Sequence, residues 1–275
     1  MSNCLVTEDL LKKFKDLAYS KRRKVGIGFG EPNDAVFNGI RNASDFSDVV
    51  IVGAIHSDEF EVINTLQPEK VLIDMLIDHD IDAAVRGTIS ASKLLPYLKQ
   101  RVNVEHVYRA ALLSTYGNIP FFLAPVGIDE GRTISGRLEL ALRASYLLTK
   151  IGVAPKVGVL SGGRAEDVGR SKTVDITLKE AEELTDLLKS AGIDAINYNI
   201  LLEEAIKGSN IILTPDGLCG NLIFRTLVFL GGGKGHGAPL IGLPYTFVDT
   251  SRSGTAFEDA IMLASALRNS LNISL

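Results

Sequence analysis

The chain has 275 residues, enough to bury the core of one large or two modest domains, and its aliphatic, glycine-rich composition is typical of an α/β protein. A net charge of −4, with acidic and basic residues interspersed, excludes a broad basic surface for nucleic acid. Two cysteines, Cys4 and Cys219, exclude a disulfide framework and favour a reducing cytoplasm. We also expect neither a secretion signal nor a membrane span, since charges interrupt the apolar residues near the N-terminus and no apolar stretch is long enough.

The first predicted element is an amphipathic helix capped by Thr7. Its apolar residues are Leu10, Leu11, Phe14, Leu17 and Ala18. Strand-like and helical segments then alternate, which predicts a mostly parallel sheet covered on both faces. We expect strands at residues 25–29, 49–53, 83–86, 107–112, 121–126, 156–160, 195–198, 210–214 and 239–243. We expect helices at residues 34–41, 57–66, 90–99, 133–151, 178–191, 201–207, 220–230 and 256–272.

Two crossings between lobes are expected. Residues 152–156 lie between a long helix and a new strand, and a return is expected near Pro244. We therefore expect one α/β lobe of residues 1–152 and 245–275, a second lobe of residues 153–244, and a cleft between the two. Glycines follow several predicted strands, where open α/β sheets present backbone N–H groups to ligands.

The most informative stretch is Ile212 to Thr255. It contains a Pro-Asp-x-x-x-Gly-Asn turn, a polyglycine loop with Lys234 and His236, and the sequence Asp-Thr-Ser-Arg at residues 249–252 after a strand. Each is a candidate for anion binding. The loop at residues 231–235 lacks the Ser or Thr that follows the lysine of a P-loop. A lid or hinge is therefore as good an interpretation, with Lys234 and His236 contacting an anion when it closes.

Arginines beside glycines mark two further places. Arg86 precedes Gly87 at the end of a predicted strand, where it either binds an anion or pairs with a neighbouring carboxylate. Ser161 and Arg164 lie on a glycine-rich turn after another strand. A guanidinium fork matches the oxygens of a phosphate, so both places are candidate phosphate contacts.

Several other site types are not supported. No group of His, Cys, Asp and Glu has the spacing of metal ligands, so no metal is expected. Gly26, Gly28 and Gly30 do not have the spacing of a dinucleotide fingerprint, and Asn33 is expected to cap the helix that follows. We find no nucleophile elbow, no methyl-donor loop and no corrinoid-ligand histidine motif.

These motifs resemble the phosphate acetyl- and butyryltransferases. TPDGLCGNLIFRTL is similar to their Pro-Asp-x-x-x-Gly-Asn-x-x-x-Lys segment, and GAPLIGLPYTFVDTSRSGT to the segment that contains Asp-x-Ser-Arg. IDAAVRGTISASKLLPYL and VGVLSGG resemble two upstream elements, so the similarity covers nearly the whole chain. Within that superfamily the chain most resembles Mtx subunit X, a branch of methane-forming archaea that is described as a methyltransferase subunit.

The resemblance implies a two-lobed fold like that of isocitrate and isopropylmalate dehydrogenases, a homodimer and a ligand site between the lobes. Carried over by motif, Ser251 and Arg252 bind and polarise an acyl phosphate. The base that deprotonates coenzyme A is Asp259 or Glu258, and we select Asp259. The expected ligand-binding residues are Arg86, Ser161, Arg164, Asp216, Gly220, Asn221 and Lys234.

The chain also departs from the family pattern. Glycines and Arg164 replace the family's Ser-rich turn, Arg86 stands where a small residue is usual, and the spacing to the base is one residue longer. We therefore expect a phosphotransacetylase-like transferase associated with methyl or one-carbon transfer in methanogenesis, which binds coenzyme A or an acylated or phosphorylated metabolite. The alternative is a non-catalytic subunit that senses such a ligand in a methyltransferase complex.

Overall fold

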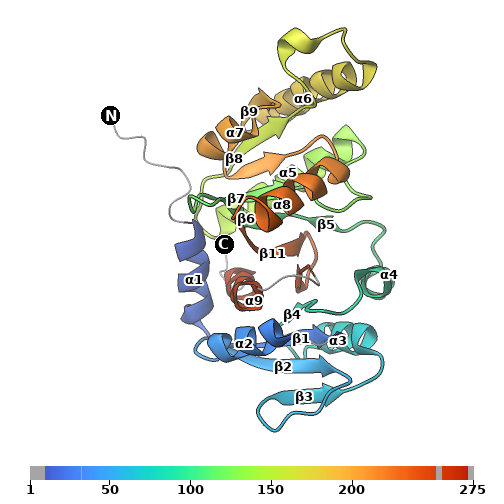
Figure 1. Ribbon diagram of the computed structural model, residues 1–275, viewed down its shortest axis with the longest axis vertical. Coiled ribbons are helices and arrows are strands. Elements are labelled where there is room, and N and C mark those ends of the chain that lie inside the picture. The colour runs from blue at the N-terminus through green and yellow to red at the C-terminus, as the bar shows by residue number, and fades with distance from the viewer. Residues whose placement is uncertain (1–9, 32, 252–255, 272–275) are drawn as a thin grey trace. The chain divides into compact units, whose positions relative to one another are not determined.

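The computed structural model describes residues 10–31, 33–251 and 256–271, which form alternating helices and strands (Figure 1). The strands are β1 (Arg23–Phe29), β2 (Ser47–Gly53), β3 (Glu61–Asn64), β4 (Ala83–Val85), β5 (Tyr108–Arg109), β6 (Ala111–Ser114), β7 (Pro120–Ala124), β8 (Lys156–Leu160), β9 (Asp194–Asn199), β10 (Ile211–Leu213), β11 (Lys234–Ile241) and β12 (Thr246–Asp249). The helices are α1 (Leu10–Ser20), α2 (Asp34–Ala43), α3 (Pro68–Ile77), α4 (Ala91–Val102), α5 (Ile134–Lys150), α6 (Lys172–Ser190), α7 (Leu202–Gly208), α8 (Gly217–Phe229) and α9 (Phe257–Leu271). A short 3₁₀ helix spans Ala165–Asp167. The predicted α/β class with mostly parallel strands is confirmed.

The chain divides into two compact units. Unit 1 contains the described residues up to Leu11 and Tyr108–Gly235, and unit 2 contains Lys12–Val107 and the described residues from His236 onward. The sequence placed the crossings at residues 152–156 and near Pro244 instead. The difference arises because β7 pairs in parallel with β10, which pairs in parallel with β8. Residues 108–152 therefore belong with the segment that follows them.

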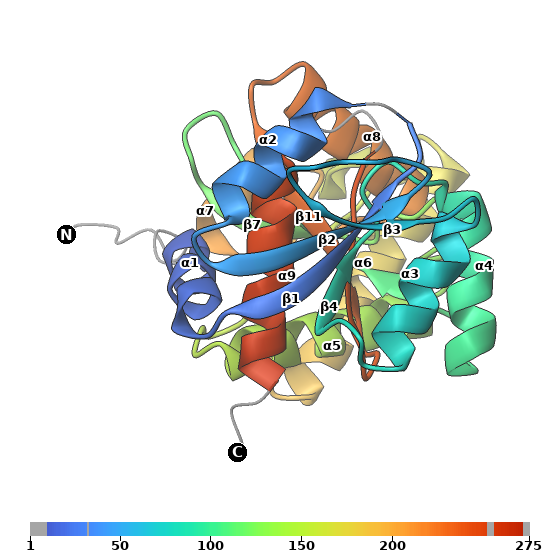
Figure 2. The same cartoon turned by 90° about the horizontal axis from the view of Figure 1, so that it is seen from below.

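Unit 2 is built on the strand order β3-β2-β1-β4-β12-β11. All neighbours in this order are parallel except β11, which runs antiparallel to β12. The carboxyl ends of the parallel strands therefore meet at one edge. Helices α2 and α9 pack against each other beside this sheet, as do α3 and α4, and the two pairs lie on different sides of β1 (Figures 1 and 2).

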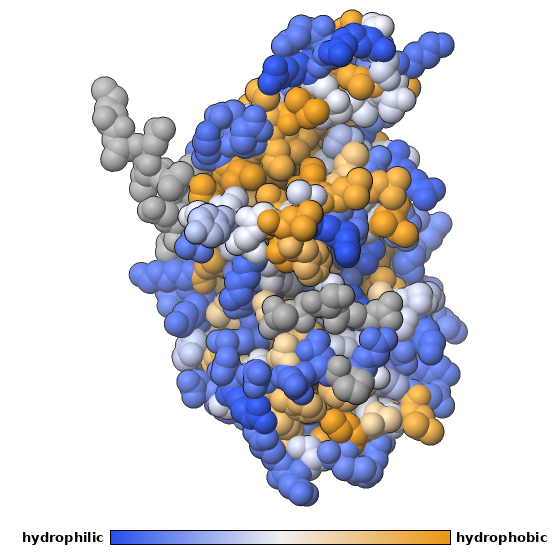
Figure 3. Space-filling model, viewed as in Figure 1, coloured by the Kyte–Doolittle hydropathy of each residue, from blue (hydrophilic) through white to orange (hydrophobic). Residues whose placement is uncertain are grey.

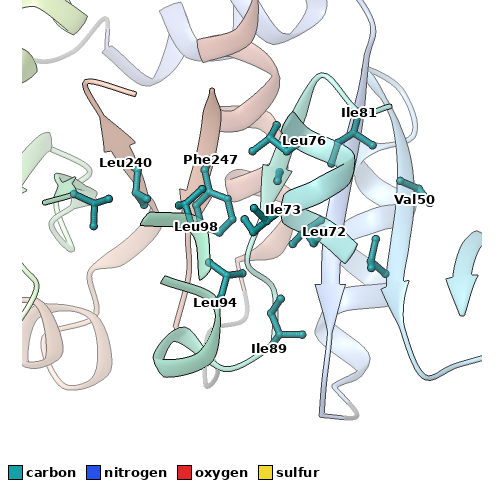
Figure 4. Close-up of a cluster of buried hydrophobic side chains, with 13 residues drawn as sticks. Val50, Leu72, Ile73, Leu76, Ile81, Ile89, Leu94, Leu98, Leu240 and Phe247 are labelled. Carbon is teal, nitrogen blue, oxygen red and sulfur yellow. The ribbon is translucent and has the colours of Figure 1, made fainter. Parts of the chain in front are cut away.

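The α3 and α4 side of this sheet holds a buried apolar cluster (Figure 4). Leu72, Ile73 and Leu76 come from α3, where their spacing places them on one face of the helix. They meet side chains from β2, α4, β11 and β12: Val50, Leu94, Leu98, Leu240 and Phe247. Because β11 and β12 follow unit 1 in the chain, this cluster joins the two sequence segments of unit 2.

Unit 1 has the strand order β6-β7-β10-β8-β9. Strands β7, β10, β8 and β9 are parallel, and β6 is antiparallel to β7. Helices α5 and α6 pack against each other, α7 packs on β8 and β9, and α8 packs on β7. In neither unit, across the described ranges, is any helix long and apolar enough to cross a membrane.

The helix predicted for residues 57–66 is wrong. The hydroxyl of Ser57 instead accepts hydrogen bonds from the N–H groups of Glu59 and Phe60, which forms a turn. Residues 61–64 then pair in parallel with β2 as the edge strand β3. The β-branched residues Val62 and Ile63 favour this extended conformation, and the tertiary pairing overrides the helical spacing.

Helix α3 was not predicted, although it carries a start signal. Pro68 occupies its first turn, where its fixed φ angle suits a helix and its missing N–H costs nothing.

The predicted cap of α2 is confirmed, because the side chain of Asn33 accepts a hydrogen bond from Ala35 N. Thr7, the predicted cap of the first helix, lies outside the described residues.

Candidate functional site

The carboxyl ends of β1 and β4 are tied together by Thr88 in unit 2. Its N–H donates to the carbonyl of Gly28 at 3.0 Å. Its hydroxyl Oγ1 accepts from the N–H of Gly30 at 3.0 Å and lies 3.1 Å from the carbonyl of Glu31. The turn after β1 is therefore held by the turn after β4, at the edge where open α/β sheets bind ligands.

A buried ion pair joins β4 to β12 at the same edge. Arg86 Nε donates to Asp249 Oδ1, and Arg86 Nη1 donates to the carbonyl of Ile89 at 2.9 Å. The side chains of Arg86 and Asp249 are only 8% and 10% exposed. Of the two interpretations that the sequence left open for Arg86, the structure supports pairing with a carboxylate. A direct contact of Arg86 with a ligand stays a prediction.

The same ion pair fixes the backbone that leaves β12. Asp249 Oδ1 also accepts from Thr250 N at 2.9 Å, and Thr250 Oγ1 donates to the carbonyl of Gly87 at 2.8 Å. Ser251 follows directly and is half-buried. Arg252, the predicted catalytic arginine, lies outside the described residues. The first part of the Asp-x-Ser-Arg motif is therefore held by residues at the end of β4.

Asp259 has a histidine partner that the sequence did not predict for it. Asp259 lies in the first turn of α9, and its Oδ2 is 3.2 Å from His236 Nδ1 in β11. The side chains of His236 and Asp259 are 5% and 14% exposed. The sequence named each residue separately, but a 23-residue separation gave no signal that they pair.

The signature Asp-Gly-x-x-Gly-Asn at residues 216–221 opens α8 in unit 1, which begins at Gly217, three residues before the predicted start. Asp216 is the N-cap residue, and its Oδ1 accepts from Cys219 N at 2.8 Å. Asn221 Nδ2 donates to the carbonyl of Val126 at 3.2 Å. A β-carbon on Gly220 would clash with the carbonyl oxygen of Pro125. The signature therefore clamps α8 against the loop after β7.

This clamp uses three of the backbone N–H donors at the start of α8 that an anion could otherwise contact. The N–H of Gly217 donates to the carbonyl of Glu130, that of Cys219 to the Asp216 carboxylate, and that of Gly220 to the Asp216 carbonyl. A carboxylate already interacts with the positive end of the helix dipole. The structure thus gives Asp216, Gly220 and Asn221 structural roles, and a ligand contact by any of them stays a prediction.

Glu130 is a buried carboxyl group that the sequence analysis did not select. Its Oε1 accepts from Arg109 Nε at 2.6 Å, and its Oε2 accepts weakly from Gly127 N at 3.4 Å. Burial raises the pKa of Glu130 above its usual value, and the charge and hydrogen bonds of Arg109 oppose that rise. The Arg109–Glu130 pair holds the loop after β7, and the N–H of Gly217 at the start of α8 donates to the carbonyl of Glu130 in this loop. Its only sequence signal was an acidic residue just after a strand.

Ser161 and Arg164 lie on the turn after β8 in unit 1. Ser161 Oγ donates to the carbonyl of Gly163 at 2.9 Å, so its hydroxyl closes its own turn. The N–H of Arg164 donates to Asp167 Oδ2 at 2.9 Å, and Arg170 pairs with the same carboxylate. These bonds lower the pKa of Asp167, the Arg164 N–H contributing most. The side chain of Arg164 is exposed, and phosphate binding there stays a prediction.

The polyglycine segment is not one continuous loop. Residues 231–233 follow α8, whereas Lys234 and Gly235 already belong to β11. Lys234 is exposed at the start of that strand. The lid or hinge interpretation can therefore apply only to the three glycines before the strand.

The predicted site residues thus fall into separate groups. Arg86, Ser251 and Asp259 lie in unit 2, whereas Asp216, Gly220 and Asn221 share the start of α8 in unit 1. Ser161 and Arg164 occupy another turn of unit 1. Within the described part of the chain, no three His, Cys, Asp or Glu side chains gather as metal ligands.

Curated proteins of methane-forming archaea are similar to the chain over most of its length. A protein of Methanosarcina mazei named "Putative methyltransferase mtx subunit X" is 46% identical over 265 residues, which cover 94% of this chain and 95% of the relative. A protein of the same name from Methanosarcina barkeri is 47% identical over 257 residues, covering 91% and 95%. An "Uncharacterized methyltransferase" from Methanocaldococcus jannaschii is 42% identical over 192 residues, covering 67% and 78%. No family model matches the chain.

Solved phosphotransacylase structures have the same fold. A phosphotransacetylase from Streptococcus pyogenes superposes with a TM-score of 0.71 at 16% identity, covering 97% of this chain and 99% of that one. A branched-chain phosphotransacylase from Enterococcus faecalis V583 gives 0.69 at 17% identity, covering 90% and 98%. At these identities the similarity establishes the fold alone.

The clamp on α8 predicts that Gly220→Ala destabilises the protein. The added methyl group would meet the carbonyl of Pro125, and such overpacking costs about 1–3 kcal/mol. Urea unfolding followed by circular dichroism measures this. Gly136→Ala in α5 is the matched control, since its new methyl group would meet only the Thr133 hydroxyl and alanine favours a helix by up to about 1 kcal/mol. Equal stability of the two variants would contradict the clamp.

Cys219, next to the clamp, is predicted to be an unreactive thiol. Burial raises its pKa to about 11, with a further contribution from its hydrogen bond to Asp216. In a Cys4→Ser background, the rate of iodoacetamide alkylation should therefore keep rising through pH 10. Asp216→Asn, which retains a capping side chain, should shift the curve to lower pH. A plateau near pH 9 in the folded Cys4→Ser protein would show that the thiol is not shielded.

Proposed function

The chain belongs to the Mtx subunit X family, and we propose that it is a transferase that acts on an anionic ligand bearing a phosphate or coenzyme A group. The observation that carries this proposal is the polar edge of the unit 2 sheet. There the Arg86–Asp249 pair holds the backbone before Ser251, and the unit also contains the buried pair of His236 and Asp259. The unit thus combines a serine hydroxyl, on backbone that follows a held strand end, with a histidine–carboxylate pair, and a transfer reaction uses groups of these kinds.

The proposed chemistry assigns each motif residue one task. Ser251 orients the carbonyl or phosphoryl oxygen of the ligand. Arg252, which is charged at every working pH, stabilises the negative charge that develops on that oxygen. Asp259 takes part in removing the proton from the attacking thiol. These tasks follow the phosphotransacetylase motif, which this chain retains at Ser251 and Arg252.

A role in methyl or one-carbon transfer during methanogenesis is the second part of the proposal. It is supported by the names of the relatives from Methanosarcina and Methanocaldococcus. The subunit X name also supports assembly with a methyltransferase complex. The fold supports group transfer to or from an acyl or phosphoryl centre, so the ligand we favour carries a phosphate or a thioester.

A non-catalytic, ligand-sensing subunit is the alternative. It is favoured because two of the predicted ligand-binding side chains already form hydrogen bonds within the protein. The Asp216 carboxylate caps α8, and the Ser161 hydroxyl closes its own turn. Such a subunit would bind the same anionic ligand without turning it over. Binding without product formation separates this alternative from the transferase.

The homodimer expected from the resemblance stays a proposal, and α8 offers a surface for it. Although α8 is rich in apolar residues, its fully buried residues are two glycines. Its exposed apolar side chains, with the residue that follows it, are Leu218, Leu222, Phe229 and Leu230. Hydrophobic side chains gather in this region of the molecular surface (Figure 3). Permanent dimers bury surfaces of this kind.

The transferase proposal predicts a specific defect in Arg252→Ala. With acetyl phosphate and coenzyme A as substrates, the variant should form acetyl-coenzyme A about a hundredfold or more slowly, because transition-state charge is no longer stabilised. Thioester absorbance measures this rate. Thermal shifts with acetyl phosphate, coenzyme A and S-adenosylmethionine, each tested alone, measure binding.

Arg22→Ala is the matched control, because Arg22 forms an exposed pair with Asp48. The control should keep the wild-type rate and the wild-type thermal shifts. Stabilisation of the wild-type protein by acetyl phosphate without thioester formation would favour the sensing subunit. An unchanged rate in Arg252→Ala would contradict the proposed role of this arginine.

A further inference from the structure

The pair of His236 and Asp259 has a defined proton arrangement. An ionised carboxylate can only accept hydrogen bonds, so the 3.2 Å contact requires the hydrogen to be on His236 Nδ1. In the neutral imidazole the other nitrogen, Nε2, then carries no hydrogen and is the basic atom. A carboxylate that holds a histidine in this tautomer is the arrangement by which enzymes orient a histidine base.

A tightly packed glycine follows His236 in β11. Gly237, next to His236, has a φ of +114°, and a β-carbon there would lie 2.6 Å from Val248 Cγ1 and 3.5 Å from Ala260 Cβ. Ala260 is the neighbour of Asp259 in α9. The positive φ and the close approach of Val248 Cγ1 in β12 therefore favour glycine at position 237, next to the histidine.

His236 lies near the start of β11, at the end of the strand pair where Ser251 follows β12. Strands β11 and β12 are antiparallel with Ala238 opposite Asp249. His236 lies two residues before Ala238, and Ser251 lies two residues after Asp249. Asp249, the charged group on β12, is itself paired with Arg86.

We propose that His236 is the proton acceptor of the transfer reaction, and that Asp259 is the residue that positions it. This inference rests on the proposed transferase function and changes which group performs its proton transfer. The phosphotransacetylase motif alone would assign the proton to Asp259. In this chain Asp259 instead accepts from the Nδ1–H of His236, and Nε2 is then the basic nitrogen of the neutral ring.

The step balances in atoms and electrons. The S–H bond of the thiol breaks, its proton goes to His236 Nε2, and the electron pair stays on sulfur. The thiolate sulfur forms a bond to the carbonyl carbon of the acyl phosphate, and the bond from that carbon to the phosphate oxygen breaks. The leaving phosphate takes the electron pair and then the proton from His236 Nε2, which restores the neutral imidazole.

The first measurement is the tautomer of His236 in the full-length protein. Nitrogen-15 NMR of histidine-labelled protein, assigned with His236→Gln, should show hydrogen on Nδ1 and none on Nε2 in the neutral ring. Asp259→Asn should lose this preference, because an amide does not demand a donor. Hydrogen on Nε2 in the neutral wild-type ring would overturn the proposal without reference to any substrate.

The second measurement is thioester formation from coenzyme A with acetyl, propionyl and butyryl phosphate. His236→Ala should lower kcat by about a hundredfold or more with little change in KM for the acyl phosphate. Added imidazole should restore part of the rate, which a purely structural role does not predict. His236→Gln, which retains a hydrogen-bonding side chain, should be similarly slow and tests whether the defect is one of folding.

Asp259→Asn should also lower kcat, but imidazole should not rescue it. His106→Ala is the control, since His106 is exposed and is not part of the proposed site. If the wild-type protein makes thioester and His236→Ala keeps the rate of His106→Ala, the histidine base is overturned and the transferase stands. If the wild-type protein makes no thioester from any of the three acyl phosphates, the transferase proposal fails, and the base role fails with it.

Discussion

The buried ion pair of Arg86 and Asp249 is the constraint on which the candidate site depends. Arg86 directly follows β4 and Asp249 is the last residue of β12, so the pair fastens two strand ends whose residues are 163 positions apart in the chain. Removing one partner of such a pair leaves an uncompensated buried charge and costs about 3–5 kcal/mol. The same carboxylate orients the N–H of Thr250, so the position of Ser251 follows from this pair.

Unit 1 shows that a family signature can owe its form to packing. The Asp-Gly-x-x-Gly-Asn segment resembles a ligand-binding element. In the structure its aspartate caps α8, its second glycine permits contact with Pro125, and its asparagine binds a backbone carbonyl. A ligand near this segment would be positioned by α8 and the loop after β7. The same chain thus uses one motif for architecture and retains the Ser251 and Arg252 positions of another, to which we assign chemistry only as a proposal.

Local patterns predicted much of the fold, and long-range pairing explains what they missed. The strand at Lys156–Leu160 and the Asn33 cap were predicted correctly, because both depend on residues close in sequence. The edge strand β3 was predicted as a helix, since its pairing with β2 is invisible to periodicity. The unit boundary depends on the pairing of β7 with β10, and the contact of His236 with Asp259 joins residues that are 23 positions apart. The family resemblance supplied Ser251, Arg252 and Asp259 as candidate site residues, but the histidine partner of Asp259 depends on a contact between residues distant in sequence.

A double-mutant cycle on Arg86 and Asp249 tests the central constraint most directly. Arg86→Leu, Asp249→Leu and the double variant would be unfolded in urea, and the three losses in free energy compared with the wild-type protein. Each single variant should lose about 3–5 kcal/mol, and the double variant clearly less than their sum, because it buries no unpaired charge. Losses that simply add, or single losses below about 1 kcal/mol like those of exposed pairs, would contradict the account.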